Sequence, residues 1–202
     1  MSDPSHGYDD LYRKAAASGG PPWDIGRPQP ALLPVLARLA GPHVLDAGCG
    51  LGDLAIEAAR RGHRVTAFDI SPVAVATARE RADRAGVTID FRVADATDLG
   101  PDLGPFDTVI DSGLLHSLDR NGEDSAAYIS ELARLCRPGA ELAVLAVSPE
   151  GGETWGLSAE WLRDSFAAPD WHVDGIDPIV VTAEVGGAEL SLGGFLLSGH
   201  RR

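Results

Sequence analysis

The chain has 202 residues, 44% of them hydrophobic, which suits one compact domain with an ordinary core. Its formal net charge of −13 argues against a nucleic acid or an anionic membrane surface as partner, because both need a basic face. The two cysteines, Cys49 and Cys136, form no CxxC pair, so neither a disulfide framework nor a metal site is expected.

The first thirty residues precede the regular part of the sequence. A short helix is expected from Tyr8 to Ala17, and residues 18–30 are too rich in glycine and proline for regular structure. An amphipathic helix, Ala31 to Leu39, follows and ends at Gly41-Pro42. The polar first residues do not resemble a signal peptide, and no apolar run could span a bilayer, so we expect a cytoplasmic protein.

Strand and helix signals alternate from residue 43. Predicted strands are His43–Asp46, Arg64–Asp69, Val87–Ala94, Phe106–Asp111 and Ala140–Val147; predicted helices are Asp53–Arg61, Pro72–Ala85 with Ser71 as N-cap, Asp124–Cys136 and Ala159–Phe166. Such alternation predicts a parallel sheet with right-handed crossovers. Two final strand-like runs, Trp171–Thr182 and Glu189–Gly199, flank the hairpin signal Val185-Gly186-Gly187, so we expect the sheet to end in an antiparallel pair.

A glycine-rich loop follows the first predicted strand. It reads Asp46-Ala47-Gly48-Cys49-Gly50-Leu51-Gly52, and it places bare backbone and one carboxylate where open α/β sheets bind ligands. A dinucleotide fingerprint would need a third glycine at the position of Asp53. A pyrophosphate would be repelled by Asp46 and Asp53, whereas a ligand with a positive centre and no phosphates would tolerate them.

Aspartates also end the next three predicted strands. Asp69 could accept hydrogen bonds from both hydroxyls of a ribose, and Asp95 could accept one from an adenine amino group, although Asp98 could take that place. Asp111 could either reach the ligand or cap the turn that begins at Ser112-Gly113.

Together these motifs resemble those of class I S-adenosylmethionine-dependent methyltransferases. The glycine loop resembles motif I, while Asp69, Asp95 and residues 106–118 match the next three motifs in order, and Arg137 to Leu142 resembles the turn into strand five. The resemblance covers about residues 30–148. It implies a doubly wound, Rossmann-like α/β fold with a seven-stranded, mostly parallel sheet and an antiparallel C-terminal strand. It also implies S-adenosylmethionine as cofactor, bound by Asp46, Gly48, Gly50, Gly52, Asp69, Ile70, Asp95, Ala96 and Asp111.

The segment Pro22 to Pro30 resembles the lid of thiopurine, thiol and halide methyltransferases. This likeness divides the chain into a lid segment, 1–30, and one methyltransferase domain, 31–202, and places Trp23, Ile25 and Gln29 near the ligands. It slightly favours a thiol as the small-molecule acceptor. O- or N-methylation of a small aromatic metabolite remains an alternative, as does a non-catalytic protein that binds S-adenosylmethionine; a dehydrogenase is disfavoured by Asp53.

Methyl transfer from a sulfonium is an in-line displacement, in which the protein mainly aligns the reactants. An oxygen acceptor would gain more than a thiol from a general base. His116 is the first candidate for such a base and Asp111 the second, although a lone histidine is more often structural. Among Trp155, Trp161 and Phe166, one is expected to line the acceptor pocket. No metal is expected, and the protein could be a monomer or a homodimer.

Overall fold

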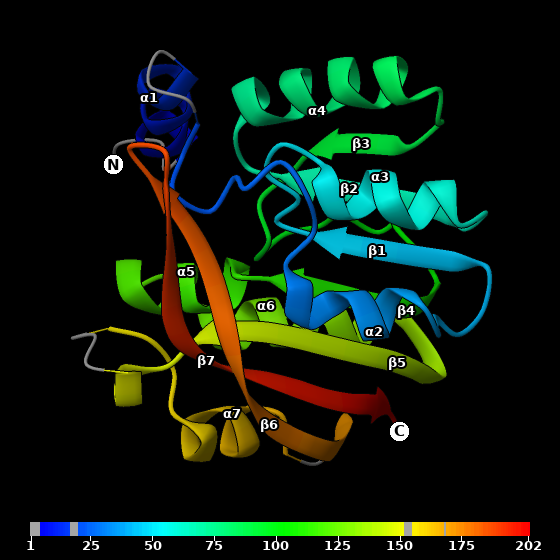
Figure 1. The fold of residues 1–202 in the computed structure, drawn as a ribbon. Coiled ribbons are helices and arrows are strands. Elements are labelled where there is room, and N and C mark those ends of the chain that lie inside the picture. The colour runs from blue at the N-terminus through cyan, green and yellow to red at the C-terminus, as the bar shows by residue number, and fades with distance from the viewer. Residues whose placement is uncertain (1–4, 17–19, 152–154, 168) are drawn as a thin grey trace.

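The computed structural model describes residues 5–16, 20–151, 155–167 and 169–202. They form a seven-stranded sheet with the strand order β3-β2-β1-β4-β5-β7-β6 (Figure 1). The strands are β1 (His43–Ala47), β2 (Arg64–Asp69), β3 (Asp90–Val93), β4 (Phe106–Ser112), β5 (Cys136–Val147), β6 (Trp171–Val185) and β7 (Ala188–Arg201). Strands β1 to β5 pair in parallel, and β7 runs antiparallel to both β5 and β6. The predicted fold class, including the antiparallel end of the sheet, is confirmed.

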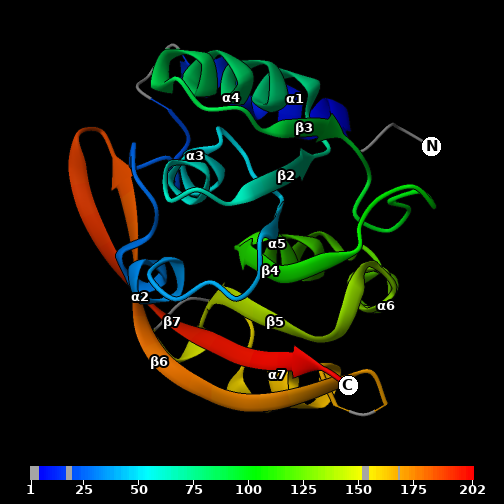
Figure 2. The ribbon, with the colours of Figure 1, turned by 90° about the vertical axis from the view of Figure 1, so that its right-hand side faces the viewer.

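Helices cover both faces of this sheet (Figure 2). They are α1 (Ser5–Ala16), α2 (Leu33–Leu36), α3 (Asp53–Arg60), α4 (Pro72–Ala85), α5 (Leu114–Asn121), α6 (Ser125–Leu135) and α7 (Ala159–Ser165), with 3₁₀ turns η1 (Pro30–Leu32) and η2 (Pro149–Gly151). Helices α2 to α4 pack on one face and α5 to α7 on the other, each side around its own apolar cluster. Successive residues of a buried strand pack into opposite clusters. In β1, Val44 packs into the cluster beneath α2 to α4, and Leu45 packs into the cluster beneath α5 to α7.

The strand register brings the carboxyl ends of the central strands to one edge. Ala47 of β1 lies beside both Phe68 of β2 and Asp111 of β4. Helix α1 and residues 20–30 lie over this edge, and the long β6–β7 hairpin rises beside α1 (Figure 1). The open end of the parallel sheet is therefore covered by two segments that are far apart in the sequence.

Several predicted boundaries were wrong for local reasons. Residues 31–39 form only the turn η1 and the single helical turn α2. Cys136 begins β5, although the sequence predicted the end of a helix there. The pairing register between β4 and β5 shifts between Phe106 and Thr108, and this irregularity accommodates Pro138-Gly139 within the strand. The Ser71 N-cap is confirmed: its hydroxyl accepts a hydrogen bond from the Ala74 amide at 3.1 Å. None of the described helices is long and apolar enough to cross a membrane.

Candidate functional site

A cavity of about 340 Å³ lies at the carboxyl edge of the sheet. Its wall combines the glycine loop, the residues that follow β2, β3 and β4, the start of α5, helix α1, residues 22–29 and the inner side of the β6–β7 hairpin. This volume falls within the range of small-molecule sites, about 300–1,000 Å³. The cavity is where the sequence motifs predicted ligand binding.

The glycine loop presents bare backbone to this cavity because side chains would not fit. Gly48 has a φ of 67°, and a Cβ on it would lie 2.7 Å from the Cβ of Leu114. Gly50 has a φ of 51°, and a Cβ there would lie 3.1 Å from the hydroxyl of Tyr12. The Cys49 amide donates to the Phe68 carbonyl at 2.8 Å, which fixes the loop to β2. Gly52 then caps the start of α3.

Asp46 lies in the wall beneath this loop. One of its carboxylate oxygens accepts a hydrogen bond from the Ala55 amide at 3.0 Å. Burial, together with the nearby charges of Asp111, Asp69 and Asp53, raises the pKa of Asp46 to about 8. Without a ligand, Asp46 is therefore largely protonated at neutral pH, and a cation placed beside it would favour its ionised form.

Asp69 holds the loop from the end of β2. One oxygen accepts from the Gly50 amide and the other from the Ser71 amide, both at 2.9 Å. Burial raises the pKa of Asp69, and these two amides oppose that rise. Each oxygen has a second lone pair, so the carboxylate can still accept hydrogen bonds from a ligand. Ile70 follows it in the cavity wall.

Asp95 and Ala96 also line the cavity, at the far end of its wall. The Asp95 side chain is exposed, and one oxygen accepts from both the amide and the hydroxyl of Thr97, at 2.8 and 2.7 Å. It thus forms an Asx turn whose second oxygen remains available.

Asp111 does not line the cavity, although the sequence predicted that it would contact the cofactor and made it the second candidate for a general base. Its carboxylate is fully buried and accepts four hydrogen bonds, from the amides of Gly113, Leu114 and Leu115 and from the Tyr128 hydroxyl, at 2.7–3.0 Å. Because α5 begins at Leu114, Asp111 ties the first turn of that helix to the end of β4. These contacts support a structural role for Asp111, whereas its expected cofactor and base roles remain predictions.

His116 lies in the cavity wall on α5. Its Nδ1 accepts a hydrogen bond from the Val147 amide at 3.4 Å, which leaves the proton of the neutral ring on Nε2. Burial, with a smaller effect from Arg120, lowers the pKa of His116 to about 4. The ring lies 5.5 Å from that of Trp155, which also lines the cavity. His116 is therefore a neutral group that is poorly suited to remove a proton.

Two of the three predicted lid residues lie in the wall. Trp23 is 47% exposed and meets Tyr12 edge-on, with ring centroids 6.2 Å apart. Gln29 is buried, and its amide group forms two hydrogen bonds with the backbone of Thr182, at 2.8 and 2.9 Å. Its polar atoms therefore hold residues 20–30 against β6. Ile25 lies outside the wall.

Two wall residues on α1, Tyr8 and Tyr12, were not predicted. They are four positions apart and so share one face of the helix, a spacing that could have indicated them. The Tyr8 hydroxyl accepts a hydrogen bond from Asn121 at 2.7 Å. Asp9 accepts hydrogen bonds from the Ser71 hydroxyl and the Val73 amide, which docks α1 on the start of α4.

The aromatic residues expected near an acceptor divide between the site and the core. Trp155 lines the cavity, Trp161 packs against the apolar cluster beneath α7, and Phe166 is buried beside Trp171. No group of three metal-ligating side chains occurs within the described ranges.

Comparison with known proteins defines the class. Residues 44–139 match the model of the methyltransferase domain family. A 2-heptyl-1-hydroxyquinolin-4(1H)-one methyltransferase of Mycobacteroides abscessus is 34% identical to the chain, with 96% of each covered. A ubiquinone biosynthesis O-methyltransferase of Xanthomonas oryzae pv. oryzae is 35% identical, over 89% of this chain and 79% of that one. A structure solved in work on the conversion of a disulfide bond into a thioacetal group during echinomycin biosynthesis superposes with a TM-score of 0.86. It is 36% identical and covers 98% of this chain and 92% of its own.

The chain belongs to the S-adenosylmethionine-dependent methyltransferases. It is an enzyme that uses S-adenosylmethionine to methylate a small molecule. Neither of the two methyltransferases named above is called a thiopurine, thiol or halide methyltransferase, so membership of that group stays a prediction.

Proposed function

We propose that the enzyme methylates an acidic oxygen on a small, flat, largely apolar acceptor. The observation that carries this proposal is the placement of His116, the histidine in the described part of the wall. Its Nδ1 accepts a hydrogen bond from the Val147 amide, and burial lowers its pKa to about 4. An alcohol would need a general base, whereas an acidic hydroxyl ionises without one. The aromatic side chains of Tyr8, Trp23 and Trp155 favour a flat ring as neighbour.

Bound S-adenosylmethionine supplies a methyl group that its sulfonium charge already activates. We expect the free lone pairs of Asp69 to accept hydrogen bonds from the ribose hydroxyls, and the second oxygen of Asp95 to face the adenine amino group, next to Ala96. The bare backbone of Gly48 and Gly50 allows a ligand to approach closely.

Residues 20–30 and α1 would act as the lid. Gln29 fixes this segment to β6, and Asp24 fixes it to α4 through Arg81, while Trp23 and Tyr12 close it over the glycine loop. A closed lid excludes water and holds the acceptor in line with the methyl group, which can account for about 7–11 kcal/mol of the barrier reduction.

The names of two relatives of this chain support an oxygen atom as the methyl acceptor. One of them acts on a 1-hydroxyquinolone, and another is named an O-methyltransferase. A thiol is the second candidate, because the structure with 36% identity comes from work on converting a disulfide into a thioacetal. A thiol is also acidic enough to ionise without a base.

The test is a panel of acceptors incubated with the enzyme and S-adenosylmethionine, with products identified by mass spectrometry. The panel holds 2-heptyl-1-hydroxyquinolin-4(1H)-one, its analogue without the N-hydroxyl, 4-nitrophenol, benzyl alcohol and 4-nitrothiophenol. We expect methylation of the acidic hydroxyls and none of benzyl alcohol. Methylation of the thiol alone would establish the second candidate, and efficient methylation of benzyl alcohol would overturn the argument from His116.

A further inference from the structure

Arg120 brings a positive charge to the part of the cavity wall that holds His116 and Trp155. It lies at the end of α5, with the carbon of its guanidinium 4.5 Å from the centroid of the Trp155 ring. Trp155 in turn lies against His116, and all three residues line the cavity. The indole ring thus holds the guanidinium in place by a cation–π contact.

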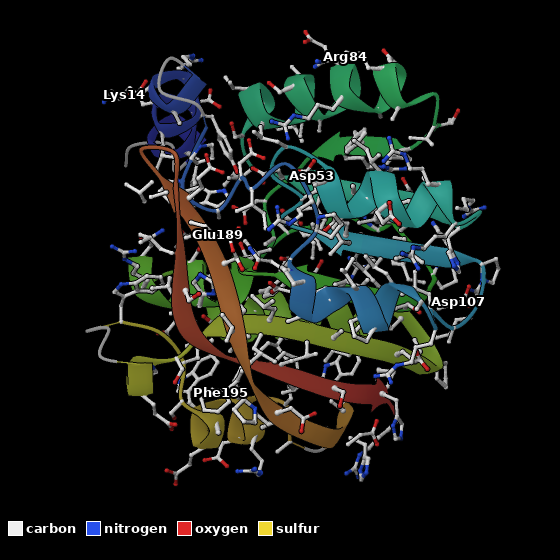
Figure 3. The ribbon with its side chains drawn as sticks, in the orientation of Figure 1. Lys14, Asp53, Arg84, Asp107, Glu189 and Phe195 are labelled. Carbon is white, nitrogen blue, oxygen red and sulfur yellow. The ribbon has the colours of Figure 1, made fainter. Side chains whose placement is uncertain are left out.

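The Arg120 guanidinium has no anionic partner among the described residues. The wall is otherwise acidic, and its carboxylates are Asp24, Asp46, Asp53, Asp69, Asp95 and Glu123. Arg27 also lines the cavity, but it forms an ion pair with Glu189 of β7 at 3.0 Å. Figure 3 labels Glu189. No described residue forms an ion pair or hydrogen bond with the Arg120 side chain, so its N–H groups are available to donate to a ligand.

We propose that Arg120 determines acceptor specificity by donating hydrogen bonds to the negatively charged heteroatom of an ionised acceptor. This inference rests on the proposed function, because that function requires the acceptor to react as its anion. The acceptor first loses its proton to solvent. Its oxygen lone pair then forms the O–CH₃ bond while the C–S bond of the donor breaks, and that electron pair stays on sulfur. The guanidinium of Arg120 stabilises the anion before transfer.

Two other roles could explain Arg120. A cation in the last turn of a helix interacts favourably with the helix dipole, so the residue could simply stabilise α5. It could also bind the carboxylate of the methionine moiety of the cofactor. Both alternatives predict measurable effects that differ from acceptor selection.

Other charges around Arg120 must be considered in any pH-dependent measurement. The titratable groups that face this part of the cavity from the surrounding elements are Tyr8, Asp69, Asp95, His116 and Glu123. The charge of Arg120 itself lowers the pKa of Tyr8 and of His116, but those pKa values, about 12 and about 4, both lie far from the range in which 4-nitrophenol titrates. A difference between variants in that range therefore reports the guanidinium.

The probe for the test is 4-nitrophenol, whose anion absorbs visible light, bound to the enzyme loaded with S-adenosylhomocysteine. This thioether lacks the sulfonium charge of the donor, so that charge cannot produce a preference for the anion, and the comparison between variants isolates the effect of Arg120. Absorbance is titrated against pH for the wild type, Arg120→Gln and Arg120→Lys. The control is Arg163→Gln, which removes the same charge from the exposed surface of α7.

We expect the wild type to lower the pKa of the bound phenol by about one unit, as an opposite charge nearby does. Arg120→Gln should abolish this shift, Arg120→Lys should retain part of it, and Arg163→Gln should match the wild type. Affinity for S-adenosylhomocysteine should stay within about twofold in all variants, a change of less than half a kcal/mol.

Three results would overturn the inference. One is a wild type that binds phenol and phenolate equally. Another is a tenfold loss of S-adenosylhomocysteine affinity in Arg120→Gln with the phenol shift retained, which would assign Arg120 to the cofactor carboxylate. The third is a lower Tm with the phenol shift retained, which would assign Arg120 to helix stability. In each of these three cases, methylation of the acidic hydroxyls in the acceptor panel would still support the proposed function.

Discussion

Arg81 of α4 binds Asp24, which lies in the segment 20–30, through two hydrogen bonds, 2.8 and 3.0 Å long, although the two residues are 57 positions apart in the sequence. Burial by itself would raise the pKa of Asp24, but the hydrogen bonds and charge of Arg81 outweigh it and lower that pKa. The same guanidinium lies 3.1 Å from Asp53, whose pKa burial raises to about 6. Figure 3 labels Asp53 where α3 begins. Arg81 therefore joins residues 20–30 to the first turn of α3, directly after the glycine loop.

Removing this link should weaken cofactor binding. Asp24→Asn keeps the shape of the side chain but loses the charge-assisted pair, which contributes about 1–2 kcal/mol for partly buried groups. We expect affinity for S-adenosylhomocysteine to fall about five- to thirtyfold in calorimetric titration. Asp102→Asn, an equal charge change on an exposed loop, serves as the control. Equal affinities of the two variants would show that the link does not hold the lid closed.

Asp69 should matter more for cofactor binding than Asp95. Asp69→Ala removes both the acceptors that hold Gly50 and Ser71 and the lone pairs that we assign to the ribose. We expect a loss of S-adenosylhomocysteine affinity of at least about thirtyfold, which corresponds to roughly 2 kcal/mol. Asp95→Ala, at an exposed Asx turn, should cost about threefold. Unchanged affinity of Asp69→Ala would remove this residue from the site.

Asp46 should make the ligand-free enzyme less stable at alkaline pH. Its pKa in the folded protein is about 8, above the value of 3.8 for an ordinary aspartate, so the folded state retains the proton more strongly. This contribution is fully present below pH 3.8 and is lost as the pH rises through 8. Between pH 7 and pH 9 the wild type should lose about 1 kcal/mol of this stabilisation, or about 2–4 °C in Tm.

Asp46→Asn provides the matched comparison for this pH dependence. An asparagine oxygen can still accept the hydrogen bond from the Ala55 amide, but the side chain no longer titrates. The Tm of this variant, measured by calorimetry, should change less between pH 7 and pH 9 than that of the wild type. Parallel curves for the two proteins would show that Asp46 does not titrate in this range.

The sequence predicted the parts of the site that depend on local pattern. The alternation of strands and helices, together with the glycines at positions 48, 50 and 52, was enough to predict the sheet and its ligand-binding edge. Asp111 shows the limit of such reasoning, because an aspartate at a strand end can face the cavity or cap the next helix. That choice depends on α5, which was not predicted. The pairing of Arg81 with Asp24 and of Gln29 with Thr182 is likewise set by tertiary packing, not by local sequence.

Substitution of His116 distinguishes a positioning residue from a general base. His116→Gln retains a polar side chain that can accept the hydrogen bond from the Val147 amide, but it cannot act as a base. Loss of a general base would lower kcat by about 10²–10⁴-fold. We instead expect a reduction of at most about tenfold with an acidic acceptor. The pH profile of kcat above pH 6 should keep its shape, because a histidine with a pKa of about 4 does not titrate there. A larger loss, together with the disappearance of an ionisation from that profile, would restore His116 as the base and would require a less acidic acceptor.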